Sequence, residues 1–225
     1  MRKLLLLLCV VLPNPLKLAL YRALGFRIGK NVRIGLSLIW DVRHVEIGNN
    51  CTIAHFNQFR GLQRLELGNG VYILNLNEIA GGSSNPQWSS VFIAEENVKI
   101  MSRHFFDCSG TVVLKAESLV GGRDSQFWSH SRTMADDGTL ALTSSPVEVG
   151  RGVYVGARCT LVGCTVPDGA TVAAGSVVVK RHPPEPCAVL LAGNPAVIKK
   201  RYETHPVAAP PDAESPVPVA QGAVQ

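Results

Sequence analysis

The chain has 225 residues, 46% of them hydrophobic and 17% charged, which is enough for one elongated domain with its own core. With 21 Gly, 14 Pro and only 6% aromatic residues, the composition favours a turn-rich solenoid and argues against a helical bundle. The formal net charge of +5 suggests an anionic partner, either a phosphate-bearing cofactor or a membrane surface. The basic residues are not interleaved with aromatic ones, so no nucleic-acid partner is expected.

Residues 1–27 are predicted to form an apolar helical cap. The apolar run at 4–12 is too short to span a bilayer. Arg2 and Lys3 in front of it are similar to the start of a signal peptide, but no A-x-A cleavage site follows. After the prolines at 13 and 15, apolar residues recur with helical spacing. Two interpretations stay open and are compatible: a helix that covers the end of a solenoid, or an interfacial anchor in peripheral contact with the cytoplasmic membrane face.

From residue 28 onward, a branched apolar residue followed by a small one recurs, at 28–35, 47–54 and 67–73. Residues 78–90 interrupt this repeat with a polar loop that contains Trp88 and could fold over a groove. A second loop, at 131–146, directly follows His130. Because long loops on a rigid solenoid tend to carry function, His130 becomes a candidate site residue.

The repeat is most regular in residues 149–179. The branched residues there stand six apart, with one step of five, at Val149, Val155, Leu161, Val166, Val172 and Val178. A period of six fits neither a helix nor a half-exposed strand. It fits a chain that turns a corner every six residues, so that three sides make one triangular coil and stacked coils form parallel sheets. The pattern therefore predicts a β-helix over residues 28–182.

The remaining chain and the cysteines complete the expected organisation. Residues 183–203 are predicted to form an extended segment and a short helix, and the Pro/Ala-rich residues 204–225 a disordered tail. Cys51 and Cys159 fall on inward positions of the repeat. We interpret the six cysteines as reduced core residues in a reducing compartment, with a disulfide framework as the weaker alternative.

The repeats of 149–179, followed by V-V-K-R-H-P-P and L-A-G-N-P-A-V-I-K-K-R, resemble the left-handed β-helix acyltransferases of the hexapeptide-repeat superfamily, over residues 28 to about 202. The likeness extends to sugar O-acetyltransferases, including those of polysaccharide biosynthesis. It implies an all-β, left-handed parallel β-helix and a homotrimer. Acetyl-CoA or another acyl-CoA would lie between neighbouring solenoids. Some related β-helices hold zinc with three histidines, but the histidines here lack the matching spacing, so no metal is expected.

The resemblance makes His130 the general base, because the family histidine precedes a loop in front of the last regular coils. Ser131 replaces the usual Asp or Pro after it, which leaves the orienting partner of the ring open. Three residues are candidates for contact with the acceptor. For Asn77, the alternative is a ladder of Asn side chains inside the coil. For His104, the alternatives are a structural role or the role of the base itself. For Trp128, the alternative is contact with a neighbouring subunit.

Two groups are candidates for binding the cofactor. Lys180 and Arg181 emerge where the family binds the CoA phosphates, with Lys199, Lys200 and Arg201 close in sequence; the alternative is a solvated basic end. Four small residues suit a groove for pantetheine, although coil corners need small residues too: Gly156, Ala157, Ala174 and Gly175.

An alcohol is a poor nucleophile near neutral pH, so acyl transfer to a hydroxyl needs a base, and histidine is the usual one. The sequence therefore predicts a cytoplasmic, trimeric enzyme that transfers an acyl group, most simply acetyl, from CoA to a sugar hydroxyl. Two alternatives stay open: a non-catalytic, membrane-associated β-helix scaffold, and a nucleotide-sugar N-acyltransferase.

Overall fold

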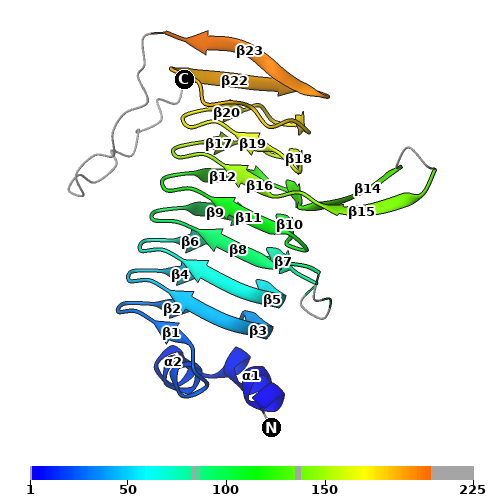
Figure 1. Ribbon diagram of the computed structural model, residues 1–225. Helices are drawn as coiled ribbons and strands as arrows, with labels where there is room; N and C mark the ends of the chain where they lie inside the picture. The colour runs from blue at the N-terminus through cyan, green and yellow to red at the C-terminus, as the bar shows by residue number, and fades with distance from the viewer. Residues whose placement is uncertain (1, 83–84, 86, 135–137, 204–225) are drawn as a thin grey trace, which may run out of the picture.

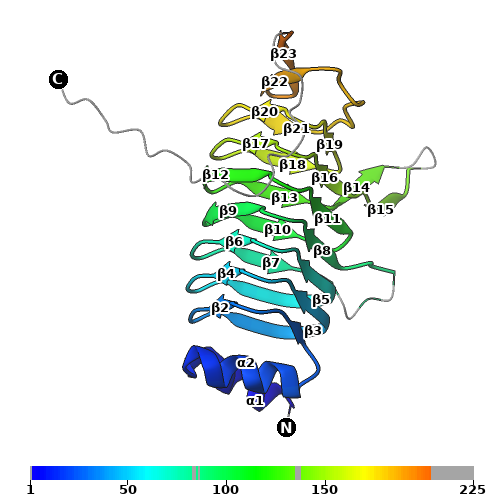
Figure 2. The same cartoon turned by 90° about the vertical axis from the view of Figure 1, so that its left-hand side faces the viewer.

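A computed structural model describes residues 2–82, 85, 87–134 and 138–203. Two short helices, α1 (Arg2–Val11) and α2 (Asn14–Ala23), lie at one end, and a stack of short parallel strands builds the rest of the molecule (Figure 1). Each coil contributes one strand to each of three faces (Figure 2). The fold is a left-handed parallel β-helix, as the six-residue repeat and the family resemblance predict.

Two of the three faces belong to one 12-stranded sheet, because the long strands β3 (Leu38–Ile47) and β5 (Gln58–Leu67) continue around a corner. The first face also holds β7 (Glu78–Ala80), β10 (Phe105–Asp107), β13 (Gln126–Trp128), β18 (Thr160–Val162) and β21 (Val177–Val178). The second face holds β1 (Arg27–Ile28), β8 (Val91–Ala94), β11 (Thr111–Leu114), β16 (Val147–Val149) and β19 (Thr165–Val166).

The third face is a nine-stranded sheet. Its strands are β2 (Arg33–Ile34), β4 (Thr52–Ile53), β6 (Tyr72–Ile73), β9 (Lys99–Ser102), β12 (Leu119–Arg123), β17 (Tyr154–Val155), β20 (Thr171–Val172), β22 (Ala188–Gly193) and β23 (Ala196–Tyr202). The predicted register is confirmed in the last coils, where Leu161 pairs with Val178, three repeat steps further along the chain.

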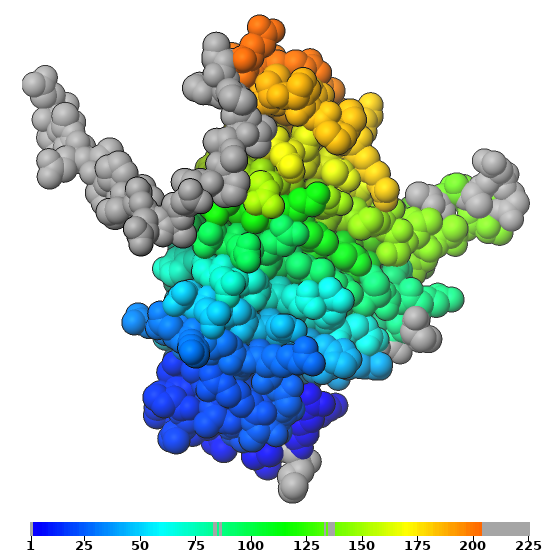
Figure 3. Space-filling view, turned by 60° about the vertical axis from the view of Figure 1, so that its left-hand side comes forward, coloured from blue at the N-terminus to red at the C-terminus, as the bar shows by residue number. Residues whose placement is uncertain are grey.

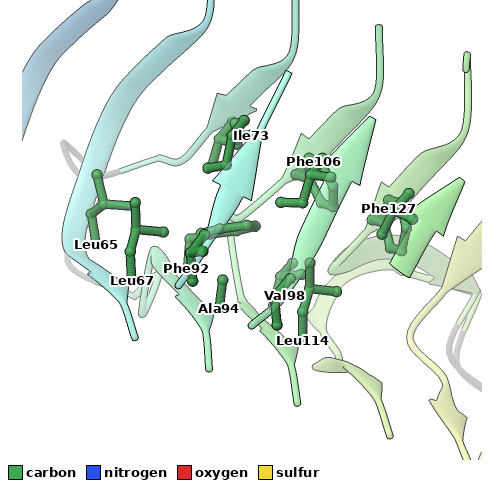
Figure 4. Close-up of a cluster of buried hydrophobic side chains, with 14 of the residues drawn as sticks. Leu65, Leu67, Ile73, Phe92, Ala94, Val98, Phe106, Leu114 and Phe127 are labelled. Carbon is green, nitrogen blue, oxygen red and sulfur yellow. The ribbon is translucent and has the colours of Figure 1, made fainter. Parts of the chain in front are cut away.

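The core is a column of inward-pointing apolar side chains that stack from coil to coil (Figure 4). Phe106 and Phe127 stack with their ring centroids 4.4 Å apart, and Phe92 meets Phe106 edge-on at 5.3 Å. Cys51 and Cys159, predicted to point inward, are both buried in this column. Because the same positions of successive repeats face the interior, spacing along the chain is enough to identify the core of the regular coils.

Two insertions leave the coil at the same corner, where the first face gives way to the second. One lies between β7 and β8 and contains Trp88; the other lies between β13 and β16 and carries a two-stranded antiparallel arm, β14 (His130–Met134) and β15 (Leu140–Ser144). The arm projects from the side of the solenoid (Figure 1). The intervening coil turns this corner tightly, from Asp107 to Thr111. Both insertions therefore flank one short turn.

The short helix predicted within residues 183–203 is wrong, because residues 196–202 form the strand β23 instead. β23 pairs antiparallel with β22, which itself extends the third face beyond β20. Val189 and Leu191 of β22 and Ala196 of β23 are buried, and Ile198 packs against the core. The edge of β22 would otherwise expose unpaired backbone N–H and C=O groups, and β23 pairs with them. This gain in hydrogen bonding outweighs the weak helical propensity of a short basic segment. The predicted tail at 204–225 lies outside the described residues.

Candidate active site

His130 stands where the first face ends and the arm begins. It is the first residue of β14 and pairs with Ser144, the last residue of β15. The base of the arm is closed by the Ser145 N–H, which donates to the Ser129 carbonyl oxygen at 2.9 Å. A Cβ added to Gly110 in the coil below would lie 2.5 Å from Ser144 Oγ, so a side chain there would push the arm away. The position of His130 is thus set by the coil rather than by the free end of the arm.

Asp107 lies against His130. The Nδ1 atom of His130 is 2.6 Å from Oδ2 of Asp107, and their side chains are 32% and 9% exposed. Asp107 ends β10, and register pairs it with Trp128, two residues before His130, on the adjacent strand β13. The parallel stacking of two successive coils therefore brings together residues that are far apart in sequence.

The carboxylate of Asp107 is held by other donors as well as by the ring. Ser109 Oγ donates to Oδ1 at 2.8 Å, and the Ser129 N–H donates to Oδ2 at 3.2 Å. Ser129 Oγ donates to the Asp107 carbonyl oxygen at 2.7 Å and accepts from the Gly110 N–H at 2.7 Å. Hydrogen bonds to a carboxylate fix its orientation. Asp107 is thus a firmly held acceptor for the imidazole.

This arrangement selects one tautomer of neutral His130. An ionised carboxylate only accepts hydrogen bonds, so Nδ1 carries the hydrogen that bonds to Asp107 and Nε2 carries the lone pair. The side chain is one-third exposed. A ring with this tautomer can take a proton at Nε2, and the neighbouring carboxylate stabilises the imidazolium that forms. The pair therefore has the chemistry of a general base with a positioning residue.

Aromatic rings surround the histidine. Trp88, from the first insertion, meets the His130 ring edge-on at a centroid distance of 5.7 Å, and Trp128 does so at 6.3 Å. Trp128 also lies 5.0 Å from the ring of Phe105, and its Nε1 donates to Gln126 at 3.1 Å. Of the predicted acceptor contacts, only Trp128 lies beside His130. Trp88 also lies there, in the loop for which the sequence suggests a position over a groove.

Asn77 and His104 lie elsewhere, in a polar ladder inside the coil. Both are 1% exposed. Asn77 Nδ2 donates to Asn57 Oδ1 at 3.0 Å, and Asn77 Oδ1 accepts from the His104 N–H at 2.9 Å. His104 Nδ1 in turn accepts from the Ser125 N–H at 3.1 Å. These contacts fit the ladder interpretation of Asn77 and the structural interpretation of His104. Neither side chain is presented to an acceptor within the described part of the chain.

We expect His104 to make stability depend on pH. Burial lowers its pKa to about 4, while the charge of Asp124 opposes this shift. The pKa of this histidine in the unfolded chain is about 6.5. At a pH between about 4 and 6.5, His104 is therefore protonated in the unfolded chain but neutral in the native state. The contribution of neutral His104 to the free energy of unfolding should thus be complete above about pH 6.5. It should fall by about 3 kcal/mol as the pH drops towards 4.

Urea unfolding of the wild type and of His104→Gln, at about pH 7.5 and about pH 4.5, measures this contribution. The variant should lose less stability than the wild type between the two conditions. An identical loss in both proteins would show that another group is responsible.

The structure places the two predicted cofactor groups on different edges of the solenoid. Lys180 and Arg181 follow β21 on the edge that carries His130. There Arg181 forms an isolated parallel β-bridge with Thr165 through its backbone. The small residues form the edge between the third and first faces. There Gly156 packs so closely that an added Cβ would lie 2.7 Å from Ala174 N, and the Gly175 N–H donates to the Ala157 carbonyl oxygen at 2.9 Å.

The other basic candidates lie on β23. Arg201 is paired with Glu185 at 3.1 Å, and Lys200 sits 4.8 Å from the ring centroid of Tyr202. Lys199 is exposed beside them. Among the described residues, no group of three or more His, Cys, Asp or Glu side chains is placed to hold a metal ion.

His130 could be singled out from the sequence, but Asp107, the partner that was left open there, could not. Asp107 was not recognisable by counting in sixes, because the insertions on either side change the length of the coils. The available signal was the position of Asp107 at the end of a strand-like segment one coil before His130.

Comparisons with known proteins agree with this fold. A family described as the hexapeptide repeat of succinyl-transferase matches residues 25–54 and 146–180. A variant of AntD, an N-acyltransferase from Bacillus cereus solved with a dTDP-amino sugar and coenzyme A, is 14% identical with a TM-score of 0.52; the match covers 80% of this chain and 86% of that one. No curated protein sequence matches the chain.

Two further solved structures have lower TM-scores. A hexapeptide-repeat acetyltransferase from Vibrio cholerae is 17% identical with a TM-score of 0.47, covering 88% of this chain and 86% of that one. The polysialic acid O-acetyltransferase OatWY is 17% identical with a TM-score of 0.44, covering 80% and 93%. The matched segments thus contain hexapeptide repeats, and the likeness to AntD agrees with the left-handed β-helix fold.

Proposed function

We propose that the protein is an acyl-CoA-dependent O-acyltransferase, most simply an acetyltransferase, that acts on a hydroxyl of a sugar or polysaccharide precursor. The observation that carries this proposal is the Asp107–His130 pair, with Nδ1 of the ring bound to the carboxylate and the side chain one-third exposed. The matched hexapeptide repeats and the likeness to AntD, an N-acyltransferase solved with coenzyme A, support an acyl-CoA as the donor.

The reaction follows from this tautomer. His130 Nε2 takes the proton of the acceptor hydroxyl while the oxygen attacks the thioester carbonyl. The tetrahedral intermediate then breaks its carbon–sulfur bond, and the departing CoA sulfur receives the proton from Nε2. The products are an acyl ester and free CoA, and His130 returns to its starting state. Asp107 keeps Nδ1 protonated and stabilises the transient imidazolium.

The surroundings of His130 favour a sugar as acceptor. Trp88 and Trp128 present indole rings beside the imidazole. Ligand sites combine apolar and aromatic walls with a few polar groups that fix orientation, and such walls suit the apolar face of a pyranose ring. Of the acceptor contacts expected from the sequence, we retain Trp128 and add Trp88; Asn77 and His104 are left out because they are buried in the coil.

A homotrimer would join the two cofactor edges. His130, Lys180 and Arg181 share one edge, whereas Gly156 and its small neighbours line another. A CoA molecule that touches both groups must lie between two subunits, each contributing one edge. The exposed apolar side chains of the arm, Met134, Leu140 and Leu142, are suited to contact a neighbouring subunit.

The test is release of free CoA thiol from acetyl-CoA in the presence of a panel of sugars, together with the mass of the assembly in solution. Sugar-dependent release by a trimer is the expected result. Release that requires an amino sugar would instead identify an N-acyltransferase. A folded protein without affinity for acyl-CoA would point to a scaffold.

Replacing Lys180 and Arg181 together by Ala should weaken the use of acetyl-CoA. If the two cations bind a CoA phosphate, losing these charge-assisted hydrogen bonds should raise the KM for acetyl-CoA at least about tenfold and leave kcat nearly unchanged. The matched control is the double change Lys199→Ala and Lys200→Ala on β23, which removes the same charge.

Acetyl-3′-dephospho-CoA serves as a second substrate for this comparison. The wild type should use it less well than acetyl-CoA if these cations bind the 3′-phosphate, and the Lys180/Arg181 variant should not distinguish the two. Equal KM changes in both double variants would assign the effect to general charge.

A further inference from the structure

The helix α1 has apolar residues on both of its sides. Leu6 and Cys9 face the solenoid and are buried in its core. On the opposite side, four apolar residues are between 48% and 71% exposed: Leu4, Leu7, Leu8 and Val11. Their spacing of i, i+3, i+4 and i+7 places them on one face, which we call the outer face of α1. A helix that only covered the end of a solenoid would be polar on this side.

The outer face is held in place by the rest of the fold. Lys17 of α2 is 2% exposed, and its Nζ donates to the carbonyl oxygens of Val10 at 3.2 Å, of Ile34 at 3.0 Å and of Gly35. One buried cation thus ties the last turn of α1 to the first coil. Because this link fixes how α1 is oriented, exposure of the four side chains is a property of the folded end, which forms the dark-blue base of the molecule (Figure 3).

The same end carries a concentrated positive charge. The first 40 residues contain seven Lys and Arg residues and no Asp or Glu, whereas the whole chain has 22 and 17. The charge of this segment exceeds the net charge of +5 of the complete chain. Six of the seven basic residues are exposed: Arg2, Lys3, Arg22, Arg27, Lys30 and Arg33, of which Arg27 is paired with Glu46 of β3 at 3.5 Å. An apolar strip flanked by cations fits a surface that is apolar inside and anionic outside.

We propose that the outer face of α1 docks on an anionic lipid surface, with the helix lying in the plane of the membrane. Leu4, Leu7, Leu8 and Val11 would enter the acyl boundary while the surrounding cations meet the headgroups. A ten-residue helix is about 15 Å long, half of the apolar thickness of a bilayer. Neither described helix is long and apolar enough to cross a membrane.

A second copy of the chain is a weaker occupant for this face. Two copies docked base to base would bring two positively charged ends together, and like charges across an interface oppose association. A lipid headgroup layer supplies the opposite charge. The docked face lies at the far end of the solenoid from β22 and β23, so the side that carries His130 and the arm stays open to acceptor and cofactor (Figure 1).

Co-sedimentation of the full chain with vesicles tests this proposal. We expect binding to vesicles of phosphatidylcholine with phosphatidylglycerol, and much weaker binding to phosphatidylcholine alone. Leu7→Asp with Leu8→Asp should reduce the partition constant at least about 100-fold, since two side chains leave the acyl region and two negative charges enter. Arg2→Gln with Lys3→Gln should reduce it about 25-fold, at about fivefold for each cation.

The matched control is Val179→Asp with Val197→Asp, which adds the same charges at two exposed valines near the other end of the solenoid and should bind like the wild type. Thermal unfolding of each variant checks that the fold is intact. Equal binding of wild type and Leu7/Leu8 variant, or no binding of the wild type to anionic vesicles, would overturn the proposal. So would wild-type assemblies, seen by sedimentation velocity, that the Leu7/Leu8 variant alone breaks up, because a second copy would then cover the face.

Discussion

Replacing His130 by Ala is expected to reduce kcat/KM for acyl transfer by about 10²–10⁴-fold, the usual contribution of a positioned general base. The acceptor hydroxyl would then have to lose its proton to water, and Asp107 is held by Ser109 and Ser129 rather than placed to replace the ring. The side chain lies outside the apolar core, so the stability of the fold should change little. CoA thiol release measures the rate.

Variants of two other histidines serve as controls for this result. His44→Ala removes an exposed histidine of β3 and should leave the rate unchanged. His104→Gln alters the buried ladder and should affect stability before it affects transfer. If the His104 variant lost activity while remaining folded, and the His130 variant kept it, the assignment of the base would be wrong.

Replacing Asp107 by Asn is expected to lower kcat by at least about 100-fold, and by as much as about 10⁴-fold if the tautomer matters as it does in catalytic triads. An Asn amide can donate to Nδ1, which would move the ring hydrogen to Nε2 and leave no lone pair there for the acceptor proton. Asn keeps one oxygen for the hydrogen bond from Ser109, so the corner should stay folded.

A structural role for Asp107 can be separated from this positioning role. Nitrogen-15 NMR of the His130 ring reports which nitrogen carries the hydrogen, and it should change in Asp107→Asn. The control is Asp124→Asn, which neutralises a carboxylate bound to Arg103 on another edge and should leave the tautomer of His130 unchanged. A fully active Asp107→Asn protein would remove this residue from the mechanism.

The periodic part of the molecule could be predicted from sequence because a six-residue repeat is a local signal. Val149, Leu161 and Val178 are inward for the same reason: each occupies the same place in its own repeat. His130 could be singled out as a candidate base because an insertion follows it directly. In both cases, the information lies within a few residues of the position concerned.

The rest of the site depends on contacts between coils, which spacing alone does not reveal. The insertion that contains Trp88 lengthens the coil before Asp107, so counting along the chain does not bring Asp107 to the corner of His130. From the sequence, Asn77 and His104 are candidate acceptor contacts, but the stacking of the coils buries both side chains. They form part of a hydrogen-bonded ladder inside the solenoid. Likewise, residues 196–202 become a strand only because β22 supplies a partner edge.

We propose that acceptor and thioester meet at His130 in a groove between two subunits. A crystal structure of the protein with CoA and the sugar that supports the fastest CoA release tests it most directly. We expect the acceptor oxygen within about 2.6–3.2 Å of His130 Nε2. We also expect the pantetheine arm to lie along Gly156 and Ala174 of the adjoining subunit. A bound acceptor remote from the imidazole, or a CoA molecule held by a single subunit away from Asp107 and His130, would contradict the account.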